Sequence, residues 1–327
     1  MRNIKNTVAA VNVLSENDDK EALYNNNSNP ILKGEYADPD IRKFGDTYYI
    51  YPTTDGFTSW SGTKFSVFSS KDKRNWKEEG VILDVASDDV AWAFDSAWAP
   101  CIEEKNGNYY FYFCAKISSG LPCIGVAVAP SPIGPFKALE EPLITLEMCT
   151  ELNIKMVIPI DPSVYSENGT NYLLFGNGHA TIVELGDDMI TIKKDTMKNY
   201  EGVFDFREAI TVLKKDGKYH FTWSCDDTGS ENYHINYGIS DNLYGPIDFK
   251  YTVLEKDSSK DILGTGHHSI TYIPEDEEYL IAYHRFATPL GRYEEGLGFH
   301  REVCLNRLEF DQNTGLMKPI RPTNELE

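Results

Sequence analysis

The stretch Ala37-Asp-Pro-Asp-Ile41 begins a pattern that recurs along the chain. A turn at Gly45-Asp46 follows it, and the aromatic run Thr47-Tyr-Tyr-Ile-Tyr51 comes next. Aromatic and β-branched residues favour strands, and Gly and Asp favour tight turns, so this unit predicts a β-hairpin. Because proline cannot donate to a strand ladder and disfavours helical backbone in the residue before it, Asp38 is expected to be extended at the start of a strand.

The same unit occurs four more times. The further copies begin at Trp98-Ala-Pro-Cys-Ile102, Ile160-Asp-Pro-Ser-Val164, Arg207-Glu-Ala-Ile210 and, as a weaker match, His267-His-Ser-Ile270. The aligned positions 38, 99, 161, 208 and 267 are separated by 61, 62, 47 and 59 residues, which suits one four-stranded sheet per repeat. The repeats therefore predict an all-β fold, a single-domain five-bladed β-propeller over residues 29–327, with an irregular sandwich or barrel as the alternative.

The two ends of the chain add to this architecture. The polar stretch over residues 1–28 is expected to form an arm outside the propeller. The segments Asn29-Pro-Ile-Leu32 and Leu316-Met-Lys-Pro-Ile320 are expected to be strands that complete a shared blade.

Composition excludes several classes of protein. The chain has 327 residues, 51 acidic and 31 basic, for a net charge of −20. A surface of that sign repels nucleic acid and anionic membranes, so neither is an expected partner. No run of 18 apolar residues occurs, and a hydrophobic content of 41% argues against general disorder.

The cysteines and the N-terminus bear on location. The six cysteines form no CxxC pair and no dense cluster, which favours free, buried thiols. The apolar stretch Thr7-Val-Ala-Ala-Val-Asn-Val-Leu14 is interrupted by Asn12 and lacks a small-residue cleavage site, so it is not expected to be a secretion signal. Together these features predict a cytoplasmic protein, with secretion as the alternative if a leader precedes this sequence.

The repeat starts also carry candidate chemistry. In a propeller the innermost strands line the central channel, and the aligned positions hold Asp38, Ala99, Asp161, Glu208 and His267. Carboxylates that face one another in a pocket ionise at different pH values, which supplies an acid and a base. Hydrolysis of a glycosidic bond needs such a pair.

These motifs together resemble glycoside hydrolase family 43. The resemblance rests on Ala37-Asp-Pro-Asp-Ile41, Ala97-Trp-Ala-Pro100, Ile160-Asp-Pro-Ser-Val164, Arg207-Glu-Ala209 and Gly264-Thr-Gly-His-His-Ser269, in this order, and covers residues 29–322. It implies an inverting enzyme on a five-bladed propeller, with Asp38 as general base, Glu208 as general acid and Asp161 as the carboxylate that tunes and orients the acid. One departure is that Ala209-Ile210 follows Glu208 where the family usually has Gly-Pro or Ala-Pro.

Three further residues are candidates for binding. The resemblance implies that His267 contacts a water-ligated metal ion, often Ca²⁺ in that family, at the channel centre, and no organic cofactor is expected. Trp98 offers an aromatic face for stacking on a sugar, with core packing as the alternative. Arg285 offers a fork of donors for sugar hydroxyls, with a structural salt bridge as the alternative.

The leading hypothesis is an exo-acting glycosidase that releases α-L-arabinofuranosyl or β-D-xylosyl units from plant-polysaccharide oligosaccharides. One alternative is a non-catalytic carbohydrate-binding propeller, because a fold alone does not imply catalysis. Another is a fructan-cleaving enzyme of the same fold, although enzymes of that group carry an Arg-Asp-Pro motif where this chain has Ile160-Asp-Pro162.

Overall fold

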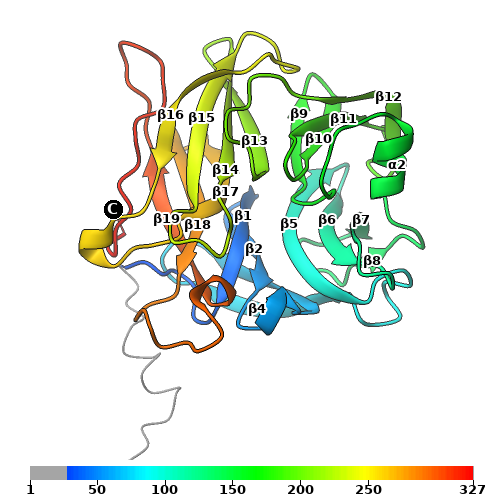
Figure 1. Ribbon diagram of the computed structural model, residues 1–327, viewed down its shortest axis with the longest axis horizontal. Coiled ribbons are helices and arrows are strands. Elements are labelled where there is room, and N and C mark those ends of the chain that lie inside the picture. The colour runs from blue at the N-terminus through cyan, green and yellow to red at the C-terminus, as the bar shows by residue number, and fades with distance from the viewer. Residues whose placement is uncertain (1–27, 327) are drawn as a thin grey trace, which may run out of the picture.

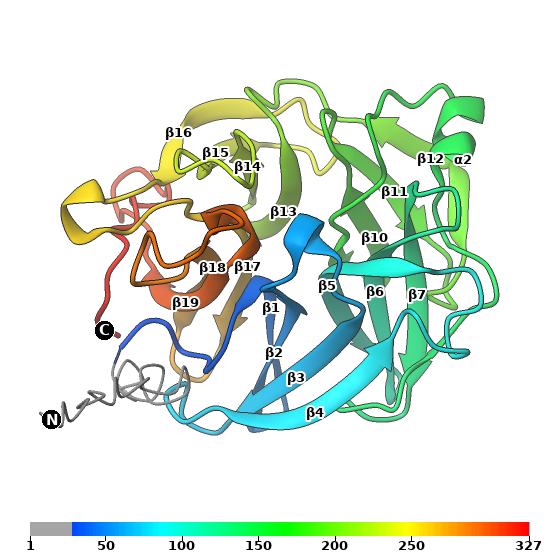
Figure 2. The same cartoon turned by 60° about the horizontal axis from the view of Figure 1, so that its bottom comes forward.

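The computed structural model describes residues 28–326 and shows five antiparallel sheets arranged around a central channel (Figure 1, Figure 2). This arrangement is the predicted five-bladed β-propeller. The predicted polar arm falls almost entirely on residues 1–27, which lie outside the described residues. Within residues 28–326, no helix has the length and apolar character needed to cross a bilayer.

Each blade is a meander in which strands pair in chain order. Blade 1 contains β1 (Tyr36–Phe44), β2 (Thr47–Thr54), β3 (Lys64–Ser70) and β4 (Lys77–Asp84). Blade 2 contains β5 (Asp95–Lys105), β6 (Asn108–Lys116), β7 (Pro122–Ala129) and β8 (Lys137–Ala138). Blade 3 contains β9 (Ser163–Glu167), β10 (Thr170–Phe175), β11 (Thr181–Leu185) and β12 (Ile192–Asn199).

Blade 4 contains β13 (Glu208–Lys215), β14 (Lys218–Cys225), β15 (His234–Ser240) and β16 (Asp248–Leu254). Blade 5 has three strands, β17 (Gly266–Ile273), β18 (Glu278–Phe286) and β19 (Arg301–Leu308). The helical segments are short and connect strands: α2 (Leu146–Glu151), η1 (Thr58–Trp60), η2 (Ser258–Lys260) and η3 (Leu297–Phe299).

The hairpin turns form where the sequence predicts them. The pairs Asn106-Gly107, Asn168-Gly169 and Asp216-Gly217 all have positive φ at both residues. Two successive positive φ values are the signature of the type I′ turn, whose twist matches that of the flanking strands. Asn, Asp and Gly tolerate this backbone, so the turn residues fix the strand register in blades 2, 3 and 4.

The strand starts are not extended, contrary to the expectation from the prolines. A non-glycine residue with positive φ stands at the beginning of the inner strand in every blade: Asp38 (48°), Ala99 (44°), Asp161 (60°), Ala209 (58°) and His267 (34°). Register shifts accompany this residue in β1, β5, β13 and β17, so the backbone kinks there. The blade 4 equivalent is Ala209, one residue after Glu208, which corrects the aligned position in that repeat.

Side chains from the neighbouring blade hold these kinks in place. The backbone N–H of Asp38 donates to His284 Nδ1 (3.2 Å), and that of Ala99 donates to Thr53 Oγ1 (2.7 Å). Two equivalent bonds join Asp161 N to Cys114 Sγ (3.2 Å) and His267 N to Ser224 Oγ (3.0 Å). Each acceptor belongs to the second strand of the preceding blade, so packing between blades stabilises a backbone that costs about 1–3 kcal/mol per residue.

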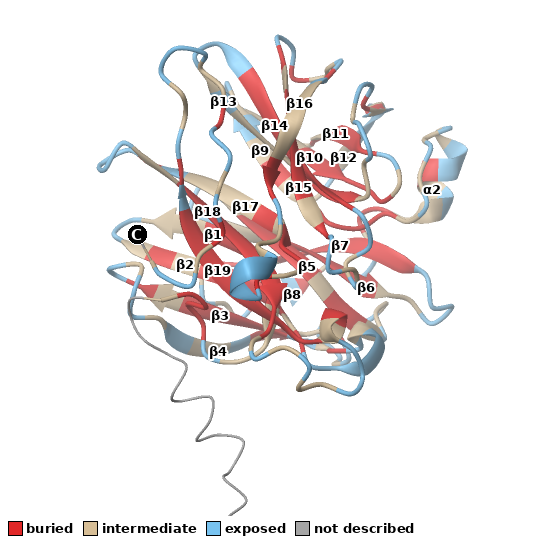
Figure 3. Ribbon diagram, turned by 60° about the vertical axis from the view of Figure 1, so that its left-hand side comes forward, coloured by how far each residue is buried: buried red, intermediate tan, exposed pale blue. Residues whose placement is uncertain are grey.

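The core lies between adjacent blades, and the buried residues concentrate on the inner strands of the sheets (Figure 3). All six cysteines are free and buried, as predicted.

The chain ends close the ring differently from the expectation. Ile31 N donates to Val303 O (2.9 Å) on β19, so the first segment does extend blade 5. Ile320 N donates to Val253 O (2.7 Å) on β16, so the second segment lies against blade 4 instead.

Candidate active site

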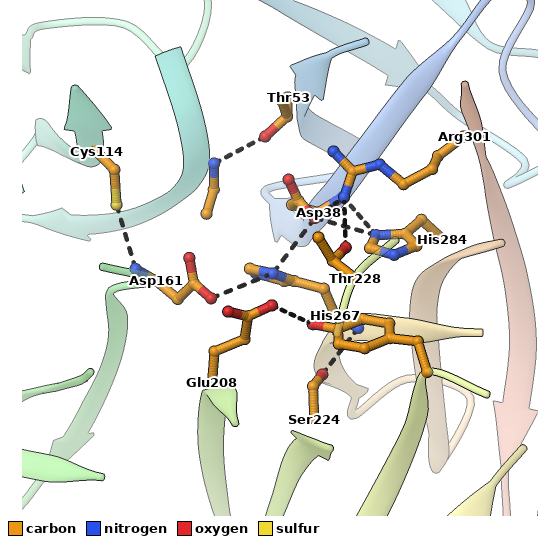
Figure 4. Close-up of polar contacts among 12 residues, drawn as sticks. Asp38, Thr53, Cys114, Asp161, Glu208, Ser224, Thr228, His267, His284 and Arg301 are labelled. Carbon is orange, nitrogen blue, oxygen red and sulfur yellow. Dashed lines mark hydrogen bonds and ion pairs between the residues drawn. The ribbon is translucent and has the colours of Figure 1, made fainter. Parts of the chain in front are cut away.

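A pocket of about 180 Å³ opens where the inner strands begin (Figure 4). Its wall contains all three predicted carboxylates, His267 and two tryptophans. The full lining is Asp38, Trp60, Trp98, Ile158, Ile160, Asp161, Asn177, Arg207, Glu208, Asp227, Thr228, His267 and Arg301. The kinked strand starts therefore bring residues from four of the predicted repeat positions to one place.

Asp38 is held as a carboxylate. Arg301 Nη1 lies 3.1 Å from Asp38 Oδ1, His284 Nδ1 lies 3.0 Å from the same oxygen, and His267 Nδ1 lies 3.3 Å from it. Burial by itself would raise the pKa of Asp38, but the charge of Arg301 is the largest cause that lowers it and holds that pKa well below its usual value. Asp38 is thus ionised and able to accept a proton.

Arg301 is itself held in place by a second carboxylate. Its Nε lies 2.8 Å from Asp55 Oδ2, and its Nη1 also donates to Thr228 Oγ1 (3.1 Å). Burial raises the pKa of Asp55 to about 6 despite this pairing. Since Arg301 is 3% exposed, it cannot swing away to solvent, and its charge stays on Asp38.

Glu208 and Asp161 form a pair that retains a proton. Burial is the first cause that raises the pKa of Glu208, and hydrogen bonds from Tyr233 (2.8 Å) and Asn177 (2.8 Å) offset part of that rise. Burial, followed by the charges of Glu208 and Asp38, raises the pKa of Asp161 well above its usual value. Two coupled carboxyls of this kind lose their protons in two steps that belong to the pair. The expectation assigned the proton to Glu208 alone, whereas here both members have raised pKa values.

One glycine allows Tyr233 to reach Glu208. A Cβ on Gly266 would lie 2.2 Å from the Tyr233 ring, so only glycine leaves room for that ring. Tyr233 also stacks on His284, with ring centroids 5.5 Å apart and planes at 6°. The hydroxyl is therefore aimed at Glu208 by packing on both sides.

His267 stands between the two aspartates. Its Nδ1 is 3.3 Å from Asp38 Oδ1 and 3.5 Å from Asp161 Oδ2. Burial lowers the pKa of His267, so the ring is neutral near pH 7. It separates the ionised aspartate from the protonated pair.

The residues around His267 offer little to a directly bound calcium ion. Calcium takes six to eight oxygen ligands. Among residues 28–326, the group of metal-ligating side chains that converges on one point does not include His267. The channel segment beneath it has a volume of about 20 Å³, on the order of one water molecule. A water-ligated ion near His267 stays a prediction, and no chemical step below depends on one.

Trp98 lines the pocket, and its stacking on a sugar stays a prediction. It is half-buried, its Nε1 donates to the carbonyl of Trp60 (2.6 Å), and Lys116 Nζ lies 4.7 Å from its ring centroid. Trp60 in turn donates to Gly298 O (2.7 Å) and meets Phe299 edge to face. The loop after β2 and the loop before β19 are thereby joined into one wall of the pocket.

Arg285 is not in this pocket, which corrects its assignment to substrate binding. It is 1% exposed, and its Nε lies 2.8 Å from Glu302 Oε1 in a buried ion pair. Successive side chains of a strand point to opposite faces, so its neighbour His284 is the residue that faces Asp38. The salt-bridge alternative describes Arg285 correctly.

The sequence analysis missed several residues of the site, above all Arg301, His284, Tyr233 and Asn177. Strand alternation in Tyr283-His-Arg-Phe286 was a usable signal for His284, since only one of two neighbours can face the channel. Arg301 and Tyr233 begin or precede strands after long loops, and no repeated motif marks them.

Comparison with known proteins agrees with this geometry. The family model described as glycosyl hydrolases family 43 matches residues 27–315. The chain belongs to this family. Family 43 enzymes are inverting glycoside hydrolases, so the protein is a glycoside hydrolase and the non-catalytic and fructan-cleaving alternatives fall away.

Two curated relatives match most of the chain. It is 32% identical to a protein named β-D-galactofuranosidase from Aspergillus niger, over 91% of this chain and 86% of that one. It is 28% identical to a xylosidase/arabinosidase from Humicola insolens, over 74% and 86% of the two chains.

Solved structures show the same family. The crystal structure of a thermostable family-43 glycoside hydrolase is 26% identical, with a TM-score of 0.76 over 92% of this chain and 98% of that one. A β-xylosidase/α-arabinofuranosidase from a compost metagenome, crystallised with xylotriose in a calcium-free form, is 25% identical, with a TM-score of 0.73 over 90% and 97%.

Proposed function

We propose that this family 43 member is an exo-acting glycosidase that releases α-L-arabinofuranosyl or β-D-xylosyl units from plant-polysaccharide oligosaccharides. The observation that carries the proposal is the division of charge in one buried pocket. Asp38 is held ionised by Arg301, while Asp161 and Glu208 retain a proton.

This division supplies both groups that an inverting hydrolysis needs. Glu208 gives the pair's proton to the glycosidic oxygen, and the bond from that oxygen to the anomeric carbon breaks. Asp38 takes a proton from a water molecule whose oxygen attacks the anomeric carbon from the opposite face. Both carboxyls of the pair are then ionised, and the charge of Asp161 next to Glu208 favours the return of a proton to Glu208.

The size of the pocket supports exo action on small sugars. A volume of about 180 Å³ is below the ~300–1,000 Å³ typical of ligand sites, so it suits about one sugar unit. Trp98 and Trp60 would provide apolar faces for the C–H groups of that sugar.

A panel of nitrophenyl glycosides tests the proposal. The panel contains α-L-arabinofuranoside, β-D-xyloside and β-D-galactopyranoside, and we expect turnover of at least one of the first two. Asp38→Asn is the active-site control, because loss of the base should slow every substrate of the panel. Absence of turnover on the whole panel and on arabino- and xylo-oligosaccharides would contradict it.

A second sugar belongs in the same panel. The relative at 32% identity is named a β-D-galactofuranosidase, and a galactofuranosyl unit shares the five-membered ring of arabinofuranose. Preference for nitrophenyl β-D-galactofuranoside over both pentosides would replace the proposed substrate but leave the chemistry of Asp38 and Glu208 intact.

Two earlier predictions remain proposals. Calcium near His267 is tested by metal analysis of protein purified without chelator. One equivalent of calcium would support it, and none would contradict it. Cytoplasmic location is supported by the six free thiols and is tested by fractionating native cells, where recovery from the medium would contradict it.

A further inference from the structure

Three metal-ligating side chains that hydrolysis does not use meet at one end of blade 4. One ligand atom each from Asp205, Cys225 and His234 lies within 4.8 Å of the other two. We propose that these three residues form a binding site for one thiolate-preferring transition metal ion of the Zn²⁺ class.

The strands and one hydrogen bond place the three ligands. Cys225 ends β14 and His234 begins β15, and the two residues are directly paired, so their side chains share a face of the sheet. Asp205 follows Phe204, whose carbonyl accepts a hydrogen bond from Trp223 Nε1 (2.9 Å). Because Trp223 is fully buried, that bond ties the Asp205 segment to blade 4.

The donor atoms are available. His234 Nδ1 lies 2.8 Å from the carbonyl oxygen of Asn232. A carbonyl only accepts, so Nδ1 carries the proton and the lone pair for a metal is on Nε2. Metal-binding histidines typically make this second bond. Within residues 28–326, no hydrogen bond or ion pair occupies the exposed Asp205 carboxylate.

The ligand types select the metal. Sulfur, imidazole nitrogen and a carboxylate suit zinc, whereas calcium takes oxygen ligands only. Ligands at ~2.0–2.3 Å from a tetrahedral zinc stand about 3.3–3.8 Å apart, so atoms within 4.8 Å of one another need to close by at most about 1.5 Å. The fourth position is left for water. On binding, the Cys225 thiol loses its proton to the buffer, so affinity increases with pH.

The site adjoins the proposed acid. Glu208 is three residues after Asp205, and Tyr233, which donates to Glu208, directly precedes His234. A bound ion would cross-link the segment leading into β13 to the start of β15. We therefore expect the ion to raise the thermal unfolding temperature of the protein.

The test uses the full chain, treated with chelator and then freed of it. Zn²⁺ binding is measured by calorimetry, and Co²⁺ is added separately because a cobalt–thiolate bond gives a charge-transfer band in the near ultraviolet. We expect one equivalent of zinc, the cobalt band, and at least about 10-fold weaker binding in Cys225→Ser and His234→Gln. Cys123→Ser, which changes a buried cysteine of blade 2, should bind like the unmodified protein.

Two results would overturn the proposal: no cobalt–thiolate band, or equal zinc binding in all variants. If Cys225→Ser does not fold, His234→Gln and Asp205→Asn decide the question, because neither side chain is buried in the core.

Discussion

Tyr233→Phe removes one oxygen atom from the site and should move the alkaline limb of the kcat/KM profile to higher pH. The Tyr233 hydroxyl donates to Glu208 Oε1 over 2.8 Å, and this bond lowers the pKa of Glu208. Hydrogen bonds to charged groups contribute about 1.5–3 kcal/mol, and 1.36 kcal/mol is one pKa unit. Deleting the bond destabilises the ionised form, so the pKa of Glu208 should rise by about 1–2 units.

The assay is kcat/KM against pH on the best nitrophenyl substrate. Because the acid is active while it holds its proton, a higher pKa keeps the enzyme active to higher pH. The stacking on His284 needs only the ring, which phenylalanine keeps. Tyr237→Phe is the matched control: Tyr237 is equally buried, but its hydroxyl contacts His220 (2.7 Å) outside the pocket. An alkaline limb that stays in place or moves down in folded Tyr233→Phe would refute the reasoning.

Three further predictions follow from the same contacts. Arg301→Met removes the positive charge that lies 3.1 Å from Asp38, so the pKa of Asp38 should rise by about 1–3 units. The acidic limb of the kcat/KM profile should then move to higher pH, and a limb that does not move would show that Asp38 is not the base. Glu208→Gln should slow substrates with poor leaving groups far more than activated aryl glycosides, and equal losses on both would argue against its role as acid. Gly266→Ala should cost about 1–3 kcal/mol in chemical denaturation, because its Cβ would overlap the Tyr233 ring, and unchanged stability would contradict the close packing.

The repeated sequence was enough to predict the propeller because it specifies local structure directly. Pairs such as Asn106-Gly107 and Asp216-Gly217 adopt the type I′ turn that their residue types favour. The aromatic runs after them form second strands whose side chains fill the spaces between blades. The turn residues and the aromatic runs thus favour the same structure.

The backbone at the strand starts could not be predicted from the prolines. A local rule makes Asp38 and Asp161 extended, but both have positive φ, since His284 and Cys114 on neighbouring blades hold their N–H groups. Those partners are 246 and 47 residues away in the chain. Contacts at such separations are a property of the closed ring and leave no mark in the local sequence.

The sequence predicted the three carboxylates of the site but not the residues that bind them. Asp38 and Asp161 share a repeat position, and Glu208 stands one residue before the equivalent Ala209, so alignment of the repeats found all three carboxylates to within one residue. Arg301, which keeps Asp38 ionised, sits outside the repeated unit. Arg285 was the wrong candidate because side chains alternate along β18, so that Arg285 pairs with Glu302 while His284 faces Asp38.

The central claim is that Asp38 acts as a base on water and not as a nucleophile. The most direct test is ¹H NMR of the first sugar released, recorded before the product equilibrates between its two anomers. We expect inversion, with β-L-arabinofuranose appearing first from an α-L-arabinofuranoside or α-D-xylose first from a β-D-xyloside. Initial release of the anomer with the substrate's own configuration would contradict it.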